Sequence, residues 1–202
     1  MEYGIQRRGI YLAPPSDADA LWFCQLFDER EIWEMFGLEG PSRLKLLRMF
    51  RSGDLVVGIL YVAATRKRIG FVVMFPPDQG RDYWEFGYAI PDVTDRDAFS
   101  ALNATDAMAH YMFEHLQVEA MGWRTRADNA SADAVVRRLG YQPHEERVFG
   151  EHRYVFYRLD REGWFKRRGR LDRGEAQHPS GIGDTFVTLP EWPFEPRLPS
   201  GS

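Results

Sequence analysis

The hydrophobic positions of this 202-residue chain change their period several times, and each change predicts a new secondary-structure element. After a short apolar strand at 10–12, Ser16 and Asp19 have the spacing of a capping box, which predicts that a helix starts there. Two more helical stretches are predicted at 31–36 and 42–50. Three β-rich runs follow them, at 55–63, 69–75 and 84–90. The first half of the chain therefore predicts short helices followed by a β-meander.

The second half opens with a long apolar face that is typical of a helix. Asp128 or Asn129 can cap a later helix, and Gly140 can end it, because glycine accepts the left-handed backbone without a steric penalty. In chain order we expect a helix at 97–116, a strand at 117–120 and 123–127 that Gly122 interrupts, the capped helix, and paired strands at 148–149 and 154–159. A meander followed by a β-α-β unit predicts a mixed α/β sheet and not a doubly wound parallel one.

Composition excludes several classes of function. The formal net charge of −4 argues against a nucleic-acid-binding protein that works by bulk charge. Cys24 is the single cysteine, so the chain can form neither an internal disulfide nor a four-cysteine zinc site. The five histidines lack metal-ligand spacing, and we expect no bound metal. No stretch has the length and apolarity of a membrane span, and no signal peptide is present, which predicts a cytoplasmic protein that does not bind membranes.

The last forty residues differ in character from the rest. Residues 161–173 are basic, and glycine and proline are frequent beyond them. We therefore predict one domain at 1–162 and a C-terminal extension at 163–202. Two apolar segments of the extension, Phe186–Leu189 and Glu191–Phe194, predict that it either packs back on the domain or docks on a protein partner.

Three motifs in the order Glu85-Phe86-Gly87-Tyr88, Asp128-Asn129 and Leu139-Gly140-Tyr141 carry a family resemblance. With the long helix between the first two, they resemble the GNAT acetyltransferase superfamily, and in particular its Rim-type protein N-acetyltransferase branch. The resemblance covers residues 10–160. It implies a mixed, mostly antiparallel central sheet flanked by helices, followed here by the Pro/Gly-rich extension.

The resemblance also implies a function and a site. The reaction would move an acetyl group from acetyl-CoA to a primary amine of a protein or a small molecule, and the protein could form a homodimer. Glu85 would act as general base and Tyr88 as a cleft residue or proton donor to the leaving thiolate. The cofactor-binding residues would be Ile90, Arg96, Asp97, Ala98, Phe99, Ser100, Ala101 and Asn129. The residues alone also allow plainer interpretations, in which Glu85 faces solvent on a strand, Tyr88 packs, and Asn129 caps a helix.

The expected pyrophosphate loop departs from the family pattern. Arg96 and Ala101 fit an Arg/Gln-x-x-Gly-x-Gly/Ala loop, but Asp97 and Phe99 stand where glycines are expected. Asp97 would bring a negative charge near a diphosphate, and Phe99 a bulky side chain where the backbone must approach closely. Two hypotheses follow. The first is an active N-acetyltransferase, and the second is a GNAT-like scaffold that has lost acetyl-CoA and works as a protein-binding or structural module.

Overall fold

The computed structural model describes residues 5–7, 9–36, 43–52, 54–77, 80–96, 98–172 and 187–188. The strands are β1 (Ile5–Arg7), β2 (Ile10–Ala13), β3 (Val56–Val62), β4 (Arg68–Phe75), β5 (Trp84–Ala89), β6 (Ala120–Arg126), β7 (Gln142–Phe149), β8 (His152–Asp160) and β9 (Val187–Thr188). The helices are α1 (Asp17–Leu26), α2 (Arg30–Met35), α3 (Arg43–Ser52), α4 (Ala98–His110), α5 (Ala130–Arg138) and α6 (Arg161–Asp172), with a 3₁₀ turn at Val93–Asp95 and a π turn at Tyr111–His115.

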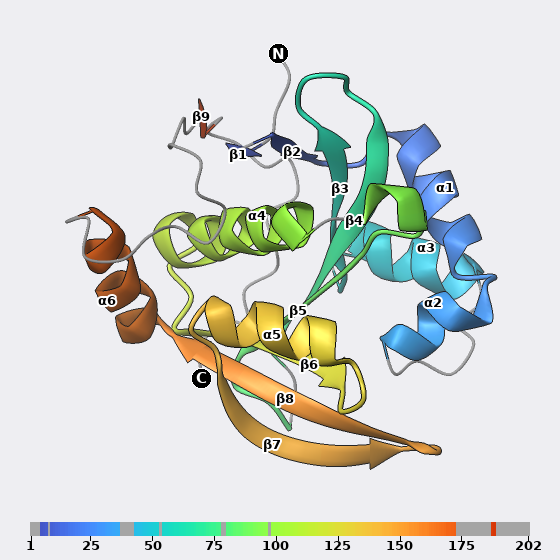
Figure 1. The fold of residues 1–202 in the computed structure, drawn as a ribbon. Helices are drawn as coiled ribbons and strands as arrows, with labels where there is room; N and C mark the ends of the chain where they lie inside the picture. Colours follow the sequence, from blue (N-terminus) through green and yellow to red (C-terminus); the bar gives the residue numbers. More distant parts are fainter. Residues whose placement is uncertain are drawn as a thin grey trace.

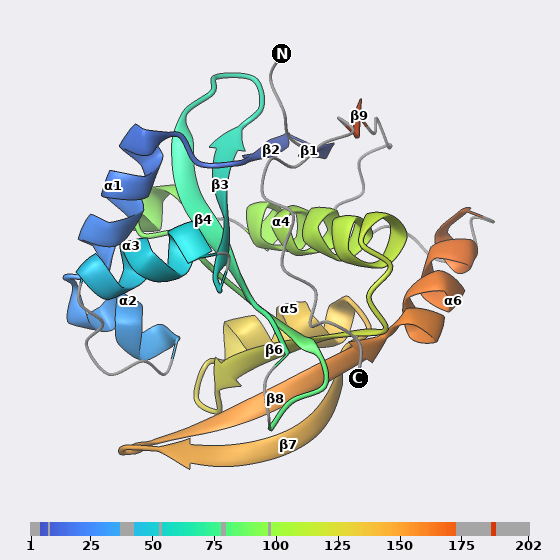
Figure 2. The same ribbon diagram turned by 180° about the vertical axis from the view of Figure 1, so that it is seen from behind.

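The strands form one sheet in the order β7-β8-β6-β5-β4-β3-β2-β1-β9. In the described part of the chain, β5 and β6 are the parallel neighbours, and every other neighbouring pair is antiparallel. The predicted mixed, mostly antiparallel sheet is confirmed. Helices α1, α2 and α3 gather beside β3 and β4, whereas α4 and α5 cover the opposite face of the sheet (Figure 1; Figure 2).

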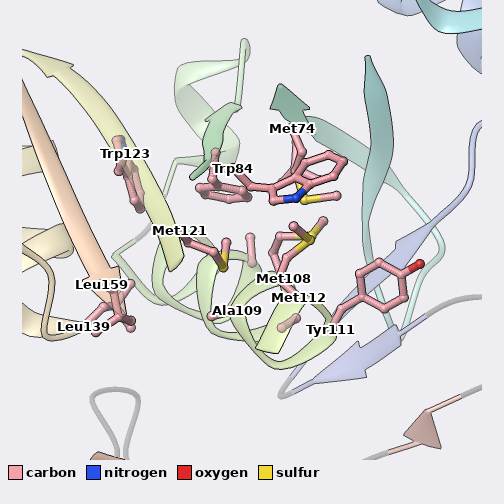
Figure 3. Close-up of a cluster of buried hydrophobic side chains, with 14 of the residues drawn as sticks. Met74, Trp84, Met108, Ala109, Tyr111, Met112, Met121, Trp123, Leu139 and Leu159 are labelled. Atoms are coloured by element: carbon pink, nitrogen blue, oxygen red, sulfur yellow. The ribbon is translucent and has the colours of Figure 1, made fainter. Parts of the chain in front are cut away.

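Each face of the sheet buries its own hydrophobic cluster. Under α1–α3 the cluster is aromatic, and the rings of Phe27 and Phe36 pack on Phe71 at 5.7 and 5.8 Å between centroids. Between the sheet and α4 the cluster is rich in methionine, and Met108 of α4 and Met112 of the π turn face the sheet residues Trp84 and Met121 (Figure 3). Both faces of the central strands are therefore buried, as expected for a sheet that helices cover on two sides.

Local signals in the sequence explain several element ends. The Ser16 hydroxyl accepts from the Asp19 amide at 3.2 Å, and the Asp19 carboxylate accepts from the Ser16 amide at 3.0 Å, which confirms the capping box. Asn129 caps α5 through a bond from the Ala132 amide to Oδ1 at 3.1 Å. Gly140 follows α5 with φ of +92°, the left-handed conformation predicted for it.

The prediction that Gly122 interrupts a strand is wrong. Strand β6 runs without a break through Gly122, and residues 117–119 precede it. A Cβ at Gly122 would lie 2.1 Å from Cε2 of Tyr83, so the glycine admits the Tyr83 ring against the strand. The predicted helix 97–116 ends in a π turn, in which the Leu116 amide donates to the Tyr111 carbonyl. Strand β7 is longer than the predicted 148–149.

Helix α6 packs on the domain, although its sequence reads as a basic linker. Trp164 is 1% exposed, stacks on Phe113 at 5.7 Å, and donates from Nε1 to Glu114 at 3.2 Å. Arg167 pairs with the fully buried Asp106 at 3.1 Å. The boundary placed at residue 163 therefore falls inside α6. Of the apolar segments farther on, Val187–Thr188 pair with β1, and the rest lies outside the described residues.

Candidate functional site

The parallel strands β5 and β6 separate from each other soon after they pair. Their register includes three residue pairs, Trp84–Met121, Glu85–Gly122 and Phe86–Trp123. Beyond these pairs β5 continues to Ala89 and β6 to Arg126. The carboxyl ends of the two strands therefore diverge, and their facing backbone groups do not form a ladder with each other there.

A cavity of about 630 Å³ lies at this divergence. Its volume falls in the range of small-molecule and cofactor sites. Strands β5 and β6 and the first turns of α4 and α5 supply most of its lining, which consists of Phe36, Gly87, Tyr88, Ala89, Ile90, Arg96, Ala101, Leu102, Trp123, Arg124, Thr125, Arg126, Asn129, Ser131, Ala132, Ala134, Val135 and Arg138.

The alternation of side chains along a strand divides this lining between the two faces of the sheet. Tyr88 and Trp123 belong to the α4/α5 side, and their rings meet edge to face at 5.3 Å. Arg124 belongs to the α1–α3 side, where Nη2 donates to the Phe36 carbonyl at 2.5 Å. Gly87 also faces Phe36, and a Cβ there would lie 2.5 Å from Cε1 of that ring. The cavity thus opens between strands and touches both helical layers.

Glu85 is buried, and its carboxylate contacts two arginines. It is 3% exposed, one oxygen accepts from Arg81, and Oε1 lies 2.9 Å from Nε of Arg124. Glu85 is not among the residues that line the cavity, whereas Arg124 is. A proton could pass from the cavity to Glu85 only through an intervening water molecule. The general-base role of Glu85 stays a prediction with this geometric condition attached.

Tyr88 lies in the cavity wall, where the resemblance places a proton donor. Burial raises the pKa of Tyr88 to about 12, against an opposing effect of the nearby Arg96 charge. The phenol therefore keeps its proton at neutral pH. No described residue hydrogen-bonds the Tyr88 hydroxyl, which leaves its proton available to a group in the cavity.

The structure brings together part of the predicted cofactor set. Ile90, Arg96, Ala101 and Asn129 line the cavity. Ala98, Phe99 and Ser100 form the first turn of α4, beside Arg96, and Asp97 lies outside the described residues. Arg96 donates to the carbonyls of Ile90 and Pro91 at 2.7 and 2.9 Å, which ties the approach to α4 to the end of β5.

Sequence reasoning missed the contribution of β6 and α5. Trp123 belongs to the last β5–β6 pair, and Arg124 and Thr125 follow it, so all three line the cavity where the strands diverge. The available signal was their place at the carboxyl end of a strand parallel to β5, where open α/β sheets bind ligands. Arg138, on the last turn of α5, also reaches the cavity.

The described residues were compared with the requirements of a metal site and of a membrane-spanning helix. They contain no group of three or more histidine, cysteine or carboxylate side chains that could hold a metal ion. None of the helices described combines the length and hydrophobicity that a bilayer span requires. Cys24 is buried in the aromatic cluster as a free thiol.

The sequence pattern of the acetyltransferase (GNAT) domain matches residues 10–142. This chain belongs to that family. The matched region contains β5, β6, α4, α5 and the whole cavity lining. A search of curated protein sequences finds no match.

Solved structures of other GNAT proteins share the fold of this GNAT chain. Spermidine N-acetyltransferase from Vibrio cholerae, in complex with CoA and spermine, aligns with a TM-score of 0.68 at 15% identity, over 78% of this chain and 98% of the other. Aminoglycoside acetyltransferase AAC(6′)-Ib, in complex with CoA, aligns at 0.64 and 11%, over 79% and 99%. FdhC, a nucleotide-linked sugar GNAT, aligns at 0.64 and 13%, over 86% and 98%. At these identities the likeness shows the fold.

Proposed function

We propose that this protein is an acetyl-CoA-dependent N-acetyltransferase that acts on a primary amine of a protein or a small molecule. The observation that carries the proposal is the 630 Å³ cavity between the separated ends of β5 and β6, in a chain of the GNAT family. Membership in the Rim-type branch, suggested by the three sequence motifs, is part of the same proposal.

The residues around the cavity fit the chemistry of acetyl-CoA. The first amides of α4 have no partner within the helix, and a helix N-terminus favours an anion such as a pyrophosphate. Arg96 precedes this helix, and Arg138 reaches the cavity from α5 on the same side of the sheet. The small residues Ala89 and Ala132 leave room for an extended chain between the strands. We assign the phosphates to Arg96, Arg138 and the start of α4.

Two side chains of this protein have proposed roles in proton movement. When bound, acetyl-CoA would supply the acetyl group on a thioester, and the amine would lose one proton while the departing sulfur gains one. Tyr88 holds its proton at the hydroxyl in the cavity wall, which suits it to protonate the sulfur. Glu85 would receive the amine proton through water, as its position outside the lining requires.

One observation favours a second candidate, a GNAT scaffold that does not catalyse transfer. None of the described residues that line the cavity is an aspartate, glutamate or histidine, so none of them is an ordinary general base. The presence of Asp97 and Phe99 in place of the two loop glycines also favours the scaffold. In this case the partner would be a protein, bound by the apolar segments of the C-terminal extension.

Thermal unfolding with and without acetyl-CoA separates the two candidates. Ligand at about a hundred times its dissociation constant stabilises the native state by ~2.7 kcal/mol. For a domain of this size that is a rise in Tm of roughly 5–10 °C. We expect this rise, and we expect Arg96→Gln to reduce it while the surface change Arg153→Gln leaves it intact. No rise with any acyl-CoA would reject the enzyme and favour the scaffold.

A further inference from the structure

We propose that the amine acceptor carries a carboxylate group and that Arg124 binds it. The inference rests on the proposed function and names the substrate class of the same cavity. It starts from the charge of the lining, whose described residues include four arginines and no carboxylate. A cavity with this charge attracts anions and repels cations.

The four arginines divide between the two sides of the cavity. Arg96 and Arg138 belong to the side of α4 and α5, where the cofactor phosphates are assigned. Arg124 and Arg126 are two residues apart in β6, so both side chains lie on the face toward α1–α3. Two of the four are therefore on the face opposite the helices that would hold the cofactor, and the phosphates of the cofactor do not account for them.

Arg124 is the better placed of these two to bind a ligand. Its side chain is 13% exposed, against 33% for Arg126, which already forms a two-point pair with the Asp128 carboxylate. Nε of Arg124 pairs with Glu85, and Nη2 donates to the Phe36 carbonyl. Nη1 of Arg124 has no partner among the described residues. Its donors remain for a group in the cavity.

The surroundings of Arg124 hold the guanidinium in place and exclude water from it. Its Cζ lies 5.6, 5.9 and 5.7 Å from the ring centroids of Phe149, Tyr154 and Phe156, which belong to the β7–β8 hairpin. Weak hydration and a fixed plane are the conditions under which arginine binds carboxylates with geometric selectivity. Glu85 does not cancel this charge alone, because it also contacts Arg81.

A polycationic acceptor would meet the opposite situation. A polyamine keeps positive charges beyond the reacting nitrogen, and within the described part of the lining no aspartate or glutamate can pair with them. An amino acid, or a peptide with a carboxylate near its amine, places a negative charge next to the nitrogen and can pair with Arg124. We therefore expect the acceptor class to be amino-acid-like.

The test compares matched acids and amides, with polyamines as a third class, using wild-type protein, acetyl-CoA and detection of the released thiol. One pool holds the twenty L-amino acids, the second holds their α-carboxamides, and the third holds putrescine, spermidine and spermine. Conversion to the amide lowers the pKa of the neighbouring amine, so intrinsic reactivity at neutral pH favours the amides. A faster rate with the acids would therefore report recognition of the carboxylate.

We expect kcat/KM for the best acid to exceed that of its amide by roughly 10- to 100-fold, the effect of hydrogen bonds to a charged group. Calorimetry of that acid and its amide with the cofactor-free protein should show the same order of affinity. A rate that is higher with amides or polyamines, or absent with all pools while acetyl-CoA still raises the Tm, would overturn this inference and leave the proposed function standing. Absence of acetyl-CoA binding as well would overturn both.

Variants of Arg124 assign the effect to this residue. Arg124→Met should lower kcat/KM for the acid by roughly 10- to 100-fold more than for the amide, which removes the preference. Arg124→Lys keeps the charge but loses the planar fork of the guanidinium, and should retain part of the preference for the acid. The matched control is Arg153→Met, an exposed arginine of β8. An unchanged acid preference in Arg124→Met would reject the assignment. If that variant fails to fold, the wild-type comparison still decides the substrate class.

Discussion

Glu85 lies in the paired part of β5 and Arg124 in the unpaired part of β6, and the 2.9 Å contact between them crosses the point where the strands separate. The pair joins a buried carboxylate to a guanidinium in the cavity wall. Arg81 contacts the same carboxylate, so Glu85 has two cationic neighbours. The contact therefore connects the predicted base with the residue that we propose binds the acceptor.

Glu85→Gln should lower kcat about 100-fold, because the proposed proton acceptor is lost, and should raise the KM for the acceptor about tenfold. The neutral amide keeps the shape of the side chain but weakens its bond to Arg124, whose orientation then relaxes. Steady-state kinetics over a pH range measure the effect. The control is Glu145→Gln, a change in an exposed glutamate that pairs with Arg147. A loss of kcat smaller than about tenfold, with an unchanged pH profile, would show that Glu85 orients Arg124 but does not accept the amine proton.

Tyr88→Phe should lower kcat about 100-fold, within the usual range for loss of a general acid, and leave the acetyl-CoA-induced rise in Tm unchanged. The pH dependence follows from the raised pKa. Because the pKa of Tyr88 is raised to about 12, the phenol stays protonated through pH 10, and the wild-type kcat should not fall through ionisation of Tyr88 below that pH. A descending limb near pH 8 that Tyr88→Phe abolishes would contradict this.

Gly122→Ala should destabilise the fold by about 1–3 kcal/mol, because the new Cβ would lie 2.1 Å from the Tyr83 ring. Urea unfolding of the single variants Gly122→Ala and Tyr83→Ala and of the double variant tests the cause. The double variant should cost less than the sum of the two singles, since removal of the ring makes room for the methyl group. Strict additivity would show that the ring is not the source of the cost.

Trp164→Ala should lower the free energy of unfolding by about 3–5 kcal/mol, because the indole is 1% exposed and stacks on Phe113. Its neighbour Phe165, which is 43% exposed, is the matched control, and Phe165→Ala should change stability by no more than about 0.5 kcal/mol. Equal effects of the two changes would show that α6 is not part of the domain. In a second test, a chain that ends after residue 172 and keeps α6 should unfold at a higher Tm than one that ends after residue 160.

The sequence predicted best the features that depend on neighbouring residues. The capping box of Ser16 and Asp19 and the left-handed Gly140 are local, because each involves only the ends of one helix. Helix α4 was predicted almost whole, since its inward face repeats at helical spacing. The order of these elements was enough to identify the family.

Features that depend on distant partners were missed or misread. Gly122 resembles a strand break unless the Tyr83 ring that packs on it is known. Helix α6 reads as a basic linker, because the contacts that hold it, from Trp164 to Phe113 and from Arg167 to Asp106, join segments far apart in the chain. The cavity-lining role of Arg124 depends on the exact length of the pairing between β5 and β6, which no local pattern encodes.

The short pairing between β5 and β6 has a mechanical consequence for the sheet. On one side of it lie β4, β3, β2, β1 and β9, and on the other β8 and β7, each half held by antiparallel ladders such as the seven pairs between β6 and β8. Three pairs join the halves, against five between β4 and β5 and seven between β6 and β8, so we expect the central sheet to have its hinge at this junction. A ligand that hydrogen-bonds to both free strand edges would act as a brace across the hinge. Its arrival should stiffen the whole sheet, including strands that never touch it.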